Sequence, residues 1–252
     1  MFYKKVIFSI IFSLFIVTTL CAKDKIKIEF LKGNTFNEEK IKKQLENSFF
    51  LDTFIATLNN KFKLEKTVLI EIGSNDGPLY ENHTNKILIP YSFYTNTFNT
   101  FKKVQYNKTG ISIENASIDV LIQTILHELA HAFIDIYNLP IVGNEENIAD
   151  SFAAVMLIEL FKNGDDILLS SADIFKLYSN NHKLENDDFI DEHSLDIQRF
   201  YDSLCYAYGS YPKKYNKFLD ELNYTQERKD LCIEDYIKNV NNWFIILKKH
   251  LK

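Results

Sequence analysis

The spacing of apolar residues changes along the chain. Residues 25–30 and 68–72 alternate apolar and polar side chains, as half-buried strands do, and residues 37–60 between them carry a helical apolar pattern. Residues 86–89 form one more short strand-like run, which ends at a proline and is therefore expected at a sheet edge. From about residue 118 onward the apolar spacing is mostly helical. The pattern predicts an α+β fold in which a small N-terminal sheet packs on a mainly helical core.

One long helix is predicted over residues 118–137, and its apolar faces place it at the centre of the core. His127 and His131 are four residues apart in this helix and therefore lie on one face, one turn apart. Both imidazoles can reach a single Zn²⁺, and Glu128 at the flank of that face can reach a water molecule held by the metal. The His-Glu-x-x-His sequence is typical of zincin metallopeptidases.

A second predicted helix supplies the ligand that two histidines lack. It begins near Gly143 and continues through residue 157, and its Glu146 and Asp150 share one face. We expect Glu146 to complete a His₂Glu ligand set, and Asp150 to accept the N–H of a ligand histidine. Because Pro140 and Gly143 supply a helix stop and a turn, we expect two antiparallel helices that offer ligands from their inner faces.

Residues 191–201 hold a third group of polar side chains. A peptide-hydrolysing site needs a donor that stabilises the oxyanion, and His193, oriented by Asp191 or Asp196, is a candidate for that role. Tyr201 is the competing donor. The alternative is structural: Ser194 would be a helix N-cap, and the acidic residues around it would favour the positive helix start. Arg199 is expected to form a structural ion pair rather than to meet a substrate carboxylate.

The first 22 residues differ from the rest. Two lysines precede an apolar run that ends in Leu-Cys-Ala, which is typical of a secretory signal peptide cleaved after Ala22. An uncleaved anchor is the alternative, but the apolar run is short for a membrane span. Lipid attachment at Cys21 is less expected, because Leu20 stands where a lipoprotein signal usually has a small residue. We expect an exported protein, periplasmic or secreted, without a membrane span after cleavage.

The remaining chain, residues 23–252, has the composition of a globular protein, with 46% hydrophobic and 14% aromatic residues in the full sequence, and one catalytic domain is expected. It keeps 27 basic and 34 acidic residues, so its net charge is near −7 and nucleic acid is not an expected partner. Its two cysteines, Cys205 and Cys232, would pair as a disulfide in an oxidising compartment. Two unrelated buried thiols are the alternative.

Together, these motifs resemble a bacterial family of putative metallopeptidases that is grouped as a domain of unknown function. The likeness covers residues from about 26 to the C-terminus and is specific from about 121 to 212. It implies an exported zinc peptidase and supplies no substrate. More distantly, the ligand arrangement is similar to that of thermolysin-type gluzincins, where the second histidine and the glutamate are further apart, so that Glu145 stays an alternative to Glu146. The resemblance is carried by His-Glu-Leu-Ala-His at 127–131, Glu-Glu-Asn-Ile-Ala-Asp at 145–150, Asp-Glu-His-Ser-Leu-Asp-Ile-Gln-Arg-Phe-Tyr at 191–201, Cys205 and Tyr-Gly-Ser at 208–210.

Two other metallopeptidase classes do not fit. A metzincin needs Gly and His where this chain has Ile134 and Tyr137, and a deformylase needs an upstream cysteine ligand, whereas the only upstream cysteine is Cys21. We therefore expect hydrolysis of a peptide or protein by a zinc-bound water, with Glu128 as general base. Residues 86–89 are the candidate strand for pairing with extended substrate. The alternative is a non-catalytic zinc-stabilised binding protein, in which a side chain such as His193 closes the fourth metal position.

Overall fold

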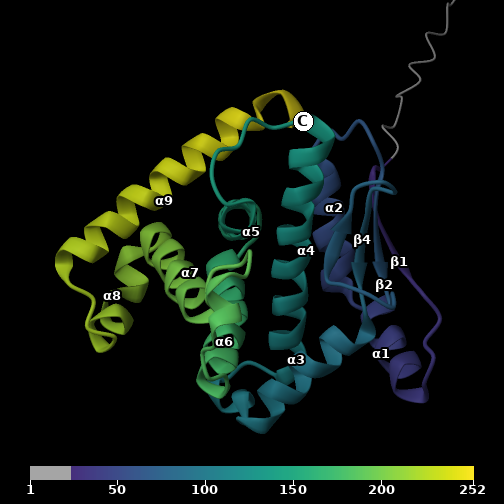
Figure 1. The fold of residues 1–252 in the computed structure, drawn as a ribbon, viewed down its shortest axis with the longest axis horizontal. Coiled ribbons are helices and arrows are strands. Elements are labelled where there is room, and N and C mark those ends of the chain that lie inside the picture. The colour runs from purple at the N-terminus through teal and green to yellow at the C-terminus, as the bar shows by residue number, and fades with distance from the viewer. Residues whose placement is uncertain (1–23) are drawn as a thin grey trace, which may run out of the picture.

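The computed structural model describes residues 24–252. The signal peptide expected over residues 1–22 and the lipid attachment considered at Cys21 lie outside the described residues. The described chain is mostly helical and carries one four-stranded sheet (Figure 1), so the α+β prediction is confirmed. In Figure 1 the sheet lies at the edge of the molecule that holds the N-terminal segments, and helices fill the rest.

The sheet has the strand order β1-β2-β4-β3. The parallel strands β1 (Ile26–Phe30), β2 (Val68–Ile72) and β4 (Lys86–Ile89) match the three strand-like runs of the sequence. The remaining strand, β3 (Leu79–Glu81), pairs antiparallel with β4. The prediction that residues 86–89 form an edge strand was therefore wrong, because β4 lies between β2 and β3. A strand of three residues is too short to show an alternating pattern, which is why β3 was not expected.

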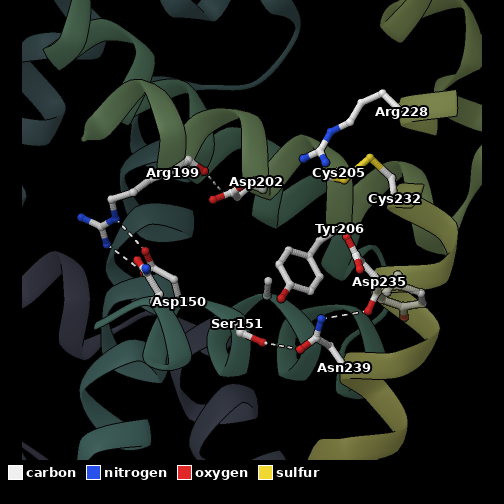
Figure 2. A pocket seen from close by; sticks show the side chains of 14 residues that line it. Asp150, Ser151, Arg199, Asp202, Cys205, Tyr206, Arg228, Cys232, Asp235 and Asn239 are labelled. Atoms are coloured by element: carbon white, nitrogen blue, oxygen red, sulfur yellow. Dashed lines mark hydrogen bonds and ion pairs between the residues drawn. A yellow bond between two sulfur atoms is a disulfide. The ribbon is translucent and has the colours of Figure 1, made fainter. Parts of the chain in front are cut away.

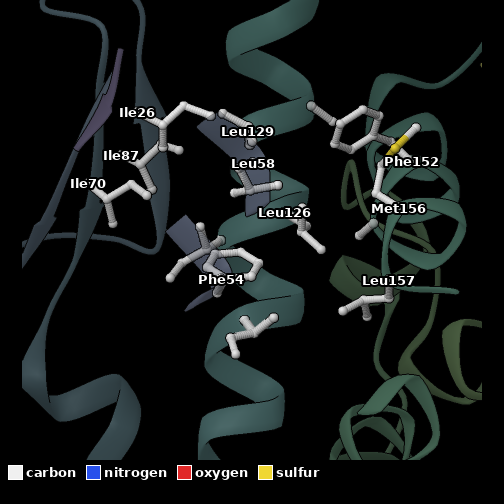
Figure 3. Close-up of a cluster of buried hydrophobic side chains, with 14 of the residues drawn as sticks. Ile26, Phe54, Leu58, Ile70, Ile87, Leu126, Leu129, Phe152, Met156 and Leu157 are labelled. Carbon is white, nitrogen blue, oxygen red and sulfur yellow. The ribbon is translucent and has the colours of Figure 1, made fainter. Parts of the chain in front are cut away.

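One face of the sheet is buried under two helices. Ile26, Ile70 and Ile87 point from the sheet toward α2 (Phe49–Lys61) and α4 (Ile113–Tyr137), as Figure 3 shows. The helix expected over residues 37–60 is in fact two helices, α1 (Phe36–Glu46) and α2. The break occurs because Ser48 caps α2 by accepting a hydrogen bond from the Leu51 amide.

Helix α4 runs through the middle of the molecule and is followed by α5 (Glu145–Leu160) (Figure 1). It begins five residues earlier than expected, since Ser112 caps it through the Asn115 amide. Among residues 24–252 it is the one helix long and apolar enough to cross a membrane, yet most of it is buried inside the fold. That burial fits the predicted core helix.

Helices α4 and α5 cross; they do not run antiparallel as expected. Figure 1 shows α4 lengthwise and α5 almost end-on beside it. Asn138 ends α4 in a left-handed conformation, and Gly143 before α5 also has a positive φ. Two such residues in one short connection redirect the chain sharply. The crossing brings the first turn of α5 against the histidine-bearing face of α4.

Helices α6 to α9 form the far side of the molecule from the sheet (Figure 1). A disulfide joins Cys205 on α7 to Cys232 on α9, so the predicted pairing is confirmed. Because α8 lies between these two helices in the sequence, the bond links the helix before α8 to the helix after it. The bounds not yet given are α3 Tyr91–Lys103, η1 Tyr106–Thr109, α6 Gly164–Asn181, η2 Asn186–Phe189, α7 Asp196–Ser210, α8 Pro212–Glu221, α9 Gln226–Ile246 and η3 Lys248–His250.

A buried carboxylate connects α6 to α8. Asp165 is 4% exposed and accepts hydrogen bonds from the Lys214 ammonium at 2.7 Å and the Tyr215 hydroxyl at 2.6 Å. Burial raises the pKa of Asp165, but the hydrogen bonds from these two donors lower it by more than burial raises it. The pKa of Asp165 therefore lies below the usual value. The ionised carboxylate therefore stabilises the folded state. This stabilisation is complete above the pKa of Asp165 in the unfolded chain, which is about 3.9. It is lost as the pH falls through the lower pKa of Asp165 in the folded protein.

Asp165→Asn should lower the free energy of unfolding at pH 7 by about 1.5–3 kcal/mol, because a charged hydrogen-bond acceptor is lost. The difference between variant and wild type should shrink as the pH falls below about 4, because Asp165 of the unfolded wild type takes up a proton there before the folded carboxylate does. Thermal unfolding of both proteins from pH 3 to pH 7 measures this. A difference that stays constant over that range would contradict the assignment.

Candidate metal centre

The two motif histidines project from the same face of α4, one turn apart. His127 is 4% exposed, and its Nε2 lies 3.3 Å from Nε2 of His131. This spacing results from the helical repeat, which the sequence predicted. Two ring nitrogens about 3.3 Å apart match neighbouring ligands of a tetrahedral metal with metal–nitrogen bonds of about 2.0–2.1 Å.

Glu146 reaches this pair from the first turn of α5. One of its carboxylate oxygens, Oε2, lies 2.9 Å from His127 Nε2, and the other, Oε1, lies 3.4 Å from His131 Nε2. Asn144 fixes the start of the helix by accepting a hydrogen bond from the Asn147 amide. Two imidazole nitrogens and one carboxylate therefore converge at His127, His131 and Glu146, the residues expected to hold the metal, and this donor set suits a divalent metal ion.

The outer nitrogen of each histidine is held by a second carboxylate. His127 Nδ1 is 2.8 Å from Asp150 Oδ1, as predicted, and His131 Nδ1 is 2.7 Å from Glu145 Oε1. The second contact shows that Glu145 and Glu146, which the sequence left as alternatives, contact different nitrogens of the histidines. Glu146 faces the inner nitrogens, while Glu145 contacts the side of His131 that points away from them. Carboxylates in such positions orient imidazoles and leave Nε2 free for a metal.

Arg199 on α7 anchors Asp150 from behind. Its Nε and Nη2 donate to the two Asp150 oxygens at 2.7 and 2.8 Å, and its guanidinium stacks on the Phe175 ring. Figure 2 shows this pair at one end of a polar pocket of about 350 Å³, with the Cys205–Cys232 disulfide at the other end. The ion pair expected for Arg199 is thus present, but its partner, 49 residues away in sequence, was not identified from the pattern.

His193 also reaches the cluster, from the loop before α7. Its Nε2 lies 2.8 Å from Glu146 Oε2, and its Nδ1 lies 3.2 Å from Asp191, one of the two aspartates considered as its orienting group. Ligand atoms of His127, Glu146 and His193 lie within 4.8 Å of one another. Ser194 does not cap α7, which begins at Asp196; its hydroxyl donates to Asn147 on α5 and ties the loop to the site.

Tyr201 lies elsewhere. It is on α7, 39% exposed, and its ring packs near those of Phe200 and Tyr224. It is absent from the residues that line the cleft at the histidines. Of the two oxyanion donors considered, the fold therefore brings His193 to the cluster and keeps Tyr201 away.

Glu128 lies beside the histidines in a different environment from Glu146. It is 7% exposed, and among residues 24–252 no side chain donates a hydrogen bond to its carboxylate. Burial therefore raises the pKa of Glu128. For Glu146 and Asp150 burial also raises the pKa, but hydrogen bonds from the histidines, and from Arg199 to Asp150, lower it well below the usual value. Two carboxylates are held ionised, and one is suited to take up a proton.

The cluster opens into a cleft of about 730 Å³. One wall is the segment 78–82, which includes β3, and the other is formed by α4 and the start of α5. The Tyr80 hydroxyl donates to Asp135 at 2.9 Å and connects the two walls. Since β3 is an edge strand, its outer backbone groups border the cleft.

The fold and this cluster define a protein with a metal-competent site on two crossed helices, open to solvent on one side. A protein-family model described as "Putative metallopeptidase" matches residues 30–247. The chain belongs to this family, and the resemblance drawn from its three motifs is confirmed. Comparison with curated proteins and with solved structures gives no match.

Asp150→Asn should weaken Zn²⁺ binding by about 10–100-fold, because the substitution removes the charge that orients His127 and makes its ring a stronger donor. Competition with a chromophoric chelator measures the affinity. Asp202→Asn is the matched control, since Asp202 lines the pocket of Figure 2 without hydrogen-bonding the cluster. Equal affinities for the two variants would show that Asp150 has no role at the metal.

Proposed function

We propose that this protein is an exported zinc-dependent metallopeptidase. The observation that carries the proposal is the convergence of His127, His131 and Glu146 at spacings that suit tetrahedral zinc, next to the buried Glu128. Export is supported by the disulfide between Cys205 and Cys232, since such bonds persist in oxidising compartments. The N-terminal segment has the composition of a signal peptide.

Three residues would hold the zinc ion: the two histidines through Nε2 and Glu146 through its carboxylate. When bound, zinc would act as a Lewis acid that polarises the scissile carbonyl and makes water a stronger nucleophile. Two imidazoles and one carboxylate form the ligand set of catalytic zinc sites that leave the fourth position open. The same arrangement supports a zincin-like reading of the α+β fold.

Glu128 is the proposed general base. Its raised pKa lets it accept a proton from the attacking water and then pass that proton to the leaving amine. His193, held by Asp191, would donate a hydrogen bond to the oxyanion that forms on the scissile carbonyl. His193 is favoured over Tyr201 because the fold places its ring at the cluster.

The substrate is a peptide or protein segment bound in extended form. Its backbone would pair with the free edge of β3, which replaces residues 86–89 as the candidate strand. The Tyr80–Asp135 hydrogen bond fixes β3 against α4, so an added strand would pass the histidines at a constant distance.

One observation favours the alternative, a zinc-stabilised binding protein without activity. His193 Nε2 is close enough to Glu146 and His127 to close the fourth position around a metal. A third imidazole in that position would leave no place for water or substrate. We favour the enzyme because no side chain among residues 24–252 pairs with Glu128 in a way that would explain its burial.

Glu128→Gln should reduce hydrolysis of a mixed peptide library by at least about 10²–10⁴-fold, since the amide cannot accept the proton. Zinc content should stay at the wild-type level, because Glu128 is not a ligand. Mass spectrometry of the products and metal analysis of the same samples measure both. Glu234→Gln, on the exposed surface of α9, is the control. Turnover retained in Glu128→Gln would remove the general-base assignment.

Glu146→Ala and Glu145→Ala should separate the roles of the adjacent glutamates. The first should lose zinc at neutral pH, because a direct ligand is gone; the second should keep stoichiometric zinc with at most a 10–100-fold weaker affinity. Metal analysis after dialysis decides between them. Zinc retained in Glu146→Ala and lost in Glu145→Ala would reverse the two assignments.

A further inference from the structure

Two separate hollows meet at the proposed catalytic residues. One is the cleft of about 730 Å³ already described, and the other is a smaller pocket of about 280 Å³. Both are lined by Pro78, His127, Glu128 and His193. A peptide bond held at these residues would therefore have the larger cleft on one side and the smaller pocket on the other.

The smaller pocket is largely apolar, and we call it the apolar pocket. Besides the shared residues His127, Glu128 and His193, its polar lining consists of Gln123, Thr124, Asp196 and Arg199, and Arg199 is engaged by Asp150. It has room for one leucine or phenylalanine side chain. Its apolar walls come from α3, α4 and α6 and consist of Phe93, Val120, Ile174, Phe175 and Tyr178.

The larger cleft is acidic, and we call it the acidic groove. Beyond the residues assigned to metal and base, four carboxylates line it, and no lysine or arginine of the described chain does so. None of the four forms an ion pair with a lysine or arginine of residues 24–252, and three of them form no ion pair with a histidine there either. The three are Glu81, Asp135 and Glu192; the fourth is Glu145, which contacts His131. Their charge is left for a ligand to neutralise.

The two hollows follow one another along α4. The apolar pocket touches α4 at residues 120–128, and the acidic groove touches it at residues 127–138. Thr124 and Asp135 are eleven positions apart, so they are separated by about 16 Å along the helix axis. An extended peptide covers that length with about five residues. One short peptide can therefore occupy both hollows while a bond between them lies at Glu128.

We propose that the site selects cationic peptides with an apolar side chain next to the bond presented to Glu128. The apolar side chain fills the apolar pocket, and lysine or arginine residues within about three positions on the other side lie over the acidic groove. Cleavage of such peptides rests on the proposed function, whereas their selective binding does not. Acidic peptides are excluded by repulsion from Glu81, Asp135 and Glu192.

Binding of four fluorescent peptide designs to zinc-loaded Glu128→Gln tests the proposal. The designs are of equal length and combine phenylalanine or serine at the central position with three lysines or three glutamates on one side. Each design is made in both chain directions. The phenylalanine and lysine peptide should bind at least about tenfold more tightly than any peptide lacking either feature. The lysine preference should weaken from low to high salt, and the phenylalanine preference should not. Equal affinities would overturn the proposal.

Variants assign each preference to its hollow. Asp135→Asn combined with Glu192→Gln should remove the lysine preference and keep the phenylalanine preference. Glu227→Gln combined with Glu234→Gln, two exposed positions on α9, makes the same charge change and should keep both preferences. Thr124→Trp should fill the apolar pocket and abolish the phenylalanine preference. Val120→Ala should enlarge the pocket and shift the preference toward tryptophan. If neither Thr124→Trp nor Val120→Ala changes the preference, the apolar pocket does not bind the apolar side chain.

Hydrolysis by the zinc-loaded wild type separates this proposal from the proposed function. Cleavage of the four peptides at equal rates would support a peptidase and overturn the inferred specificity. No cleavage of any peptide, with the binding preferences intact, would contradict the peptidase and leave the inferred ligand class in place.

Discussion

The hydrogen-bonded line from Arg199 through Asp150 and His127 to Glu146 is the interaction on which the site depends. It holds the buried His127 imidazole between two partly buried carboxylates, where unpaired charges would be costly. Each member is paired with the next, and the line joins α4, α5 and α7. Arg199 therefore fixes Asp150, Asp150 fixes the His127 ring, and the ring presents Nε2 beside Glu146. The position of α7 and the disulfide that connects it to α9 support this line from outside.

The same arrangement separates the roles of four acidic residues. Glu146 and Asp150 receive hydrogen bonds and stay ionised, and Glu145 touches the outer nitrogen of His131. Glu128 is buried and has no hydrogen-bond donor in the part of the chain that the structure describes. Their environments, rather than their chemical type, distinguish an anionic ligand from a proton acceptor. The crossing of α4 and α5 creates these environments, because it brings the first turn of α5 over the histidines and leaves Glu128 facing the open cleft.

Much of this could be predicted from local pattern, and the remainder depends on contacts far apart in sequence. Period-two alternation identified β1 and β2, a short apolar run identified β4, and the four-residue spacing placed His127 and His131 together. β3 was missed because three residues show no period, and β4 was consequently misplaced at the edge. The crossing angle of α4 and α5 depends on left-handed Asn138 and Gly143, whose sequence indicates a turn but not its direction. Arg199 and Asp150 are 49 residues apart, so no local pattern joins them.

X-ray absorption of the wild-type protein loaded with one equivalent of zinc tests the central claim most directly, since it reports the ligands around the metal without a substrate. The account predicts one zinc per chain, bound by two imidazoles, one carboxylate and one water oxygen in a four-coordinate site. A third imidazole in a closed shell would contradict the enzyme and identify His193 as a structural ligand. Failure to bind zinc would contradict the metal centre itself.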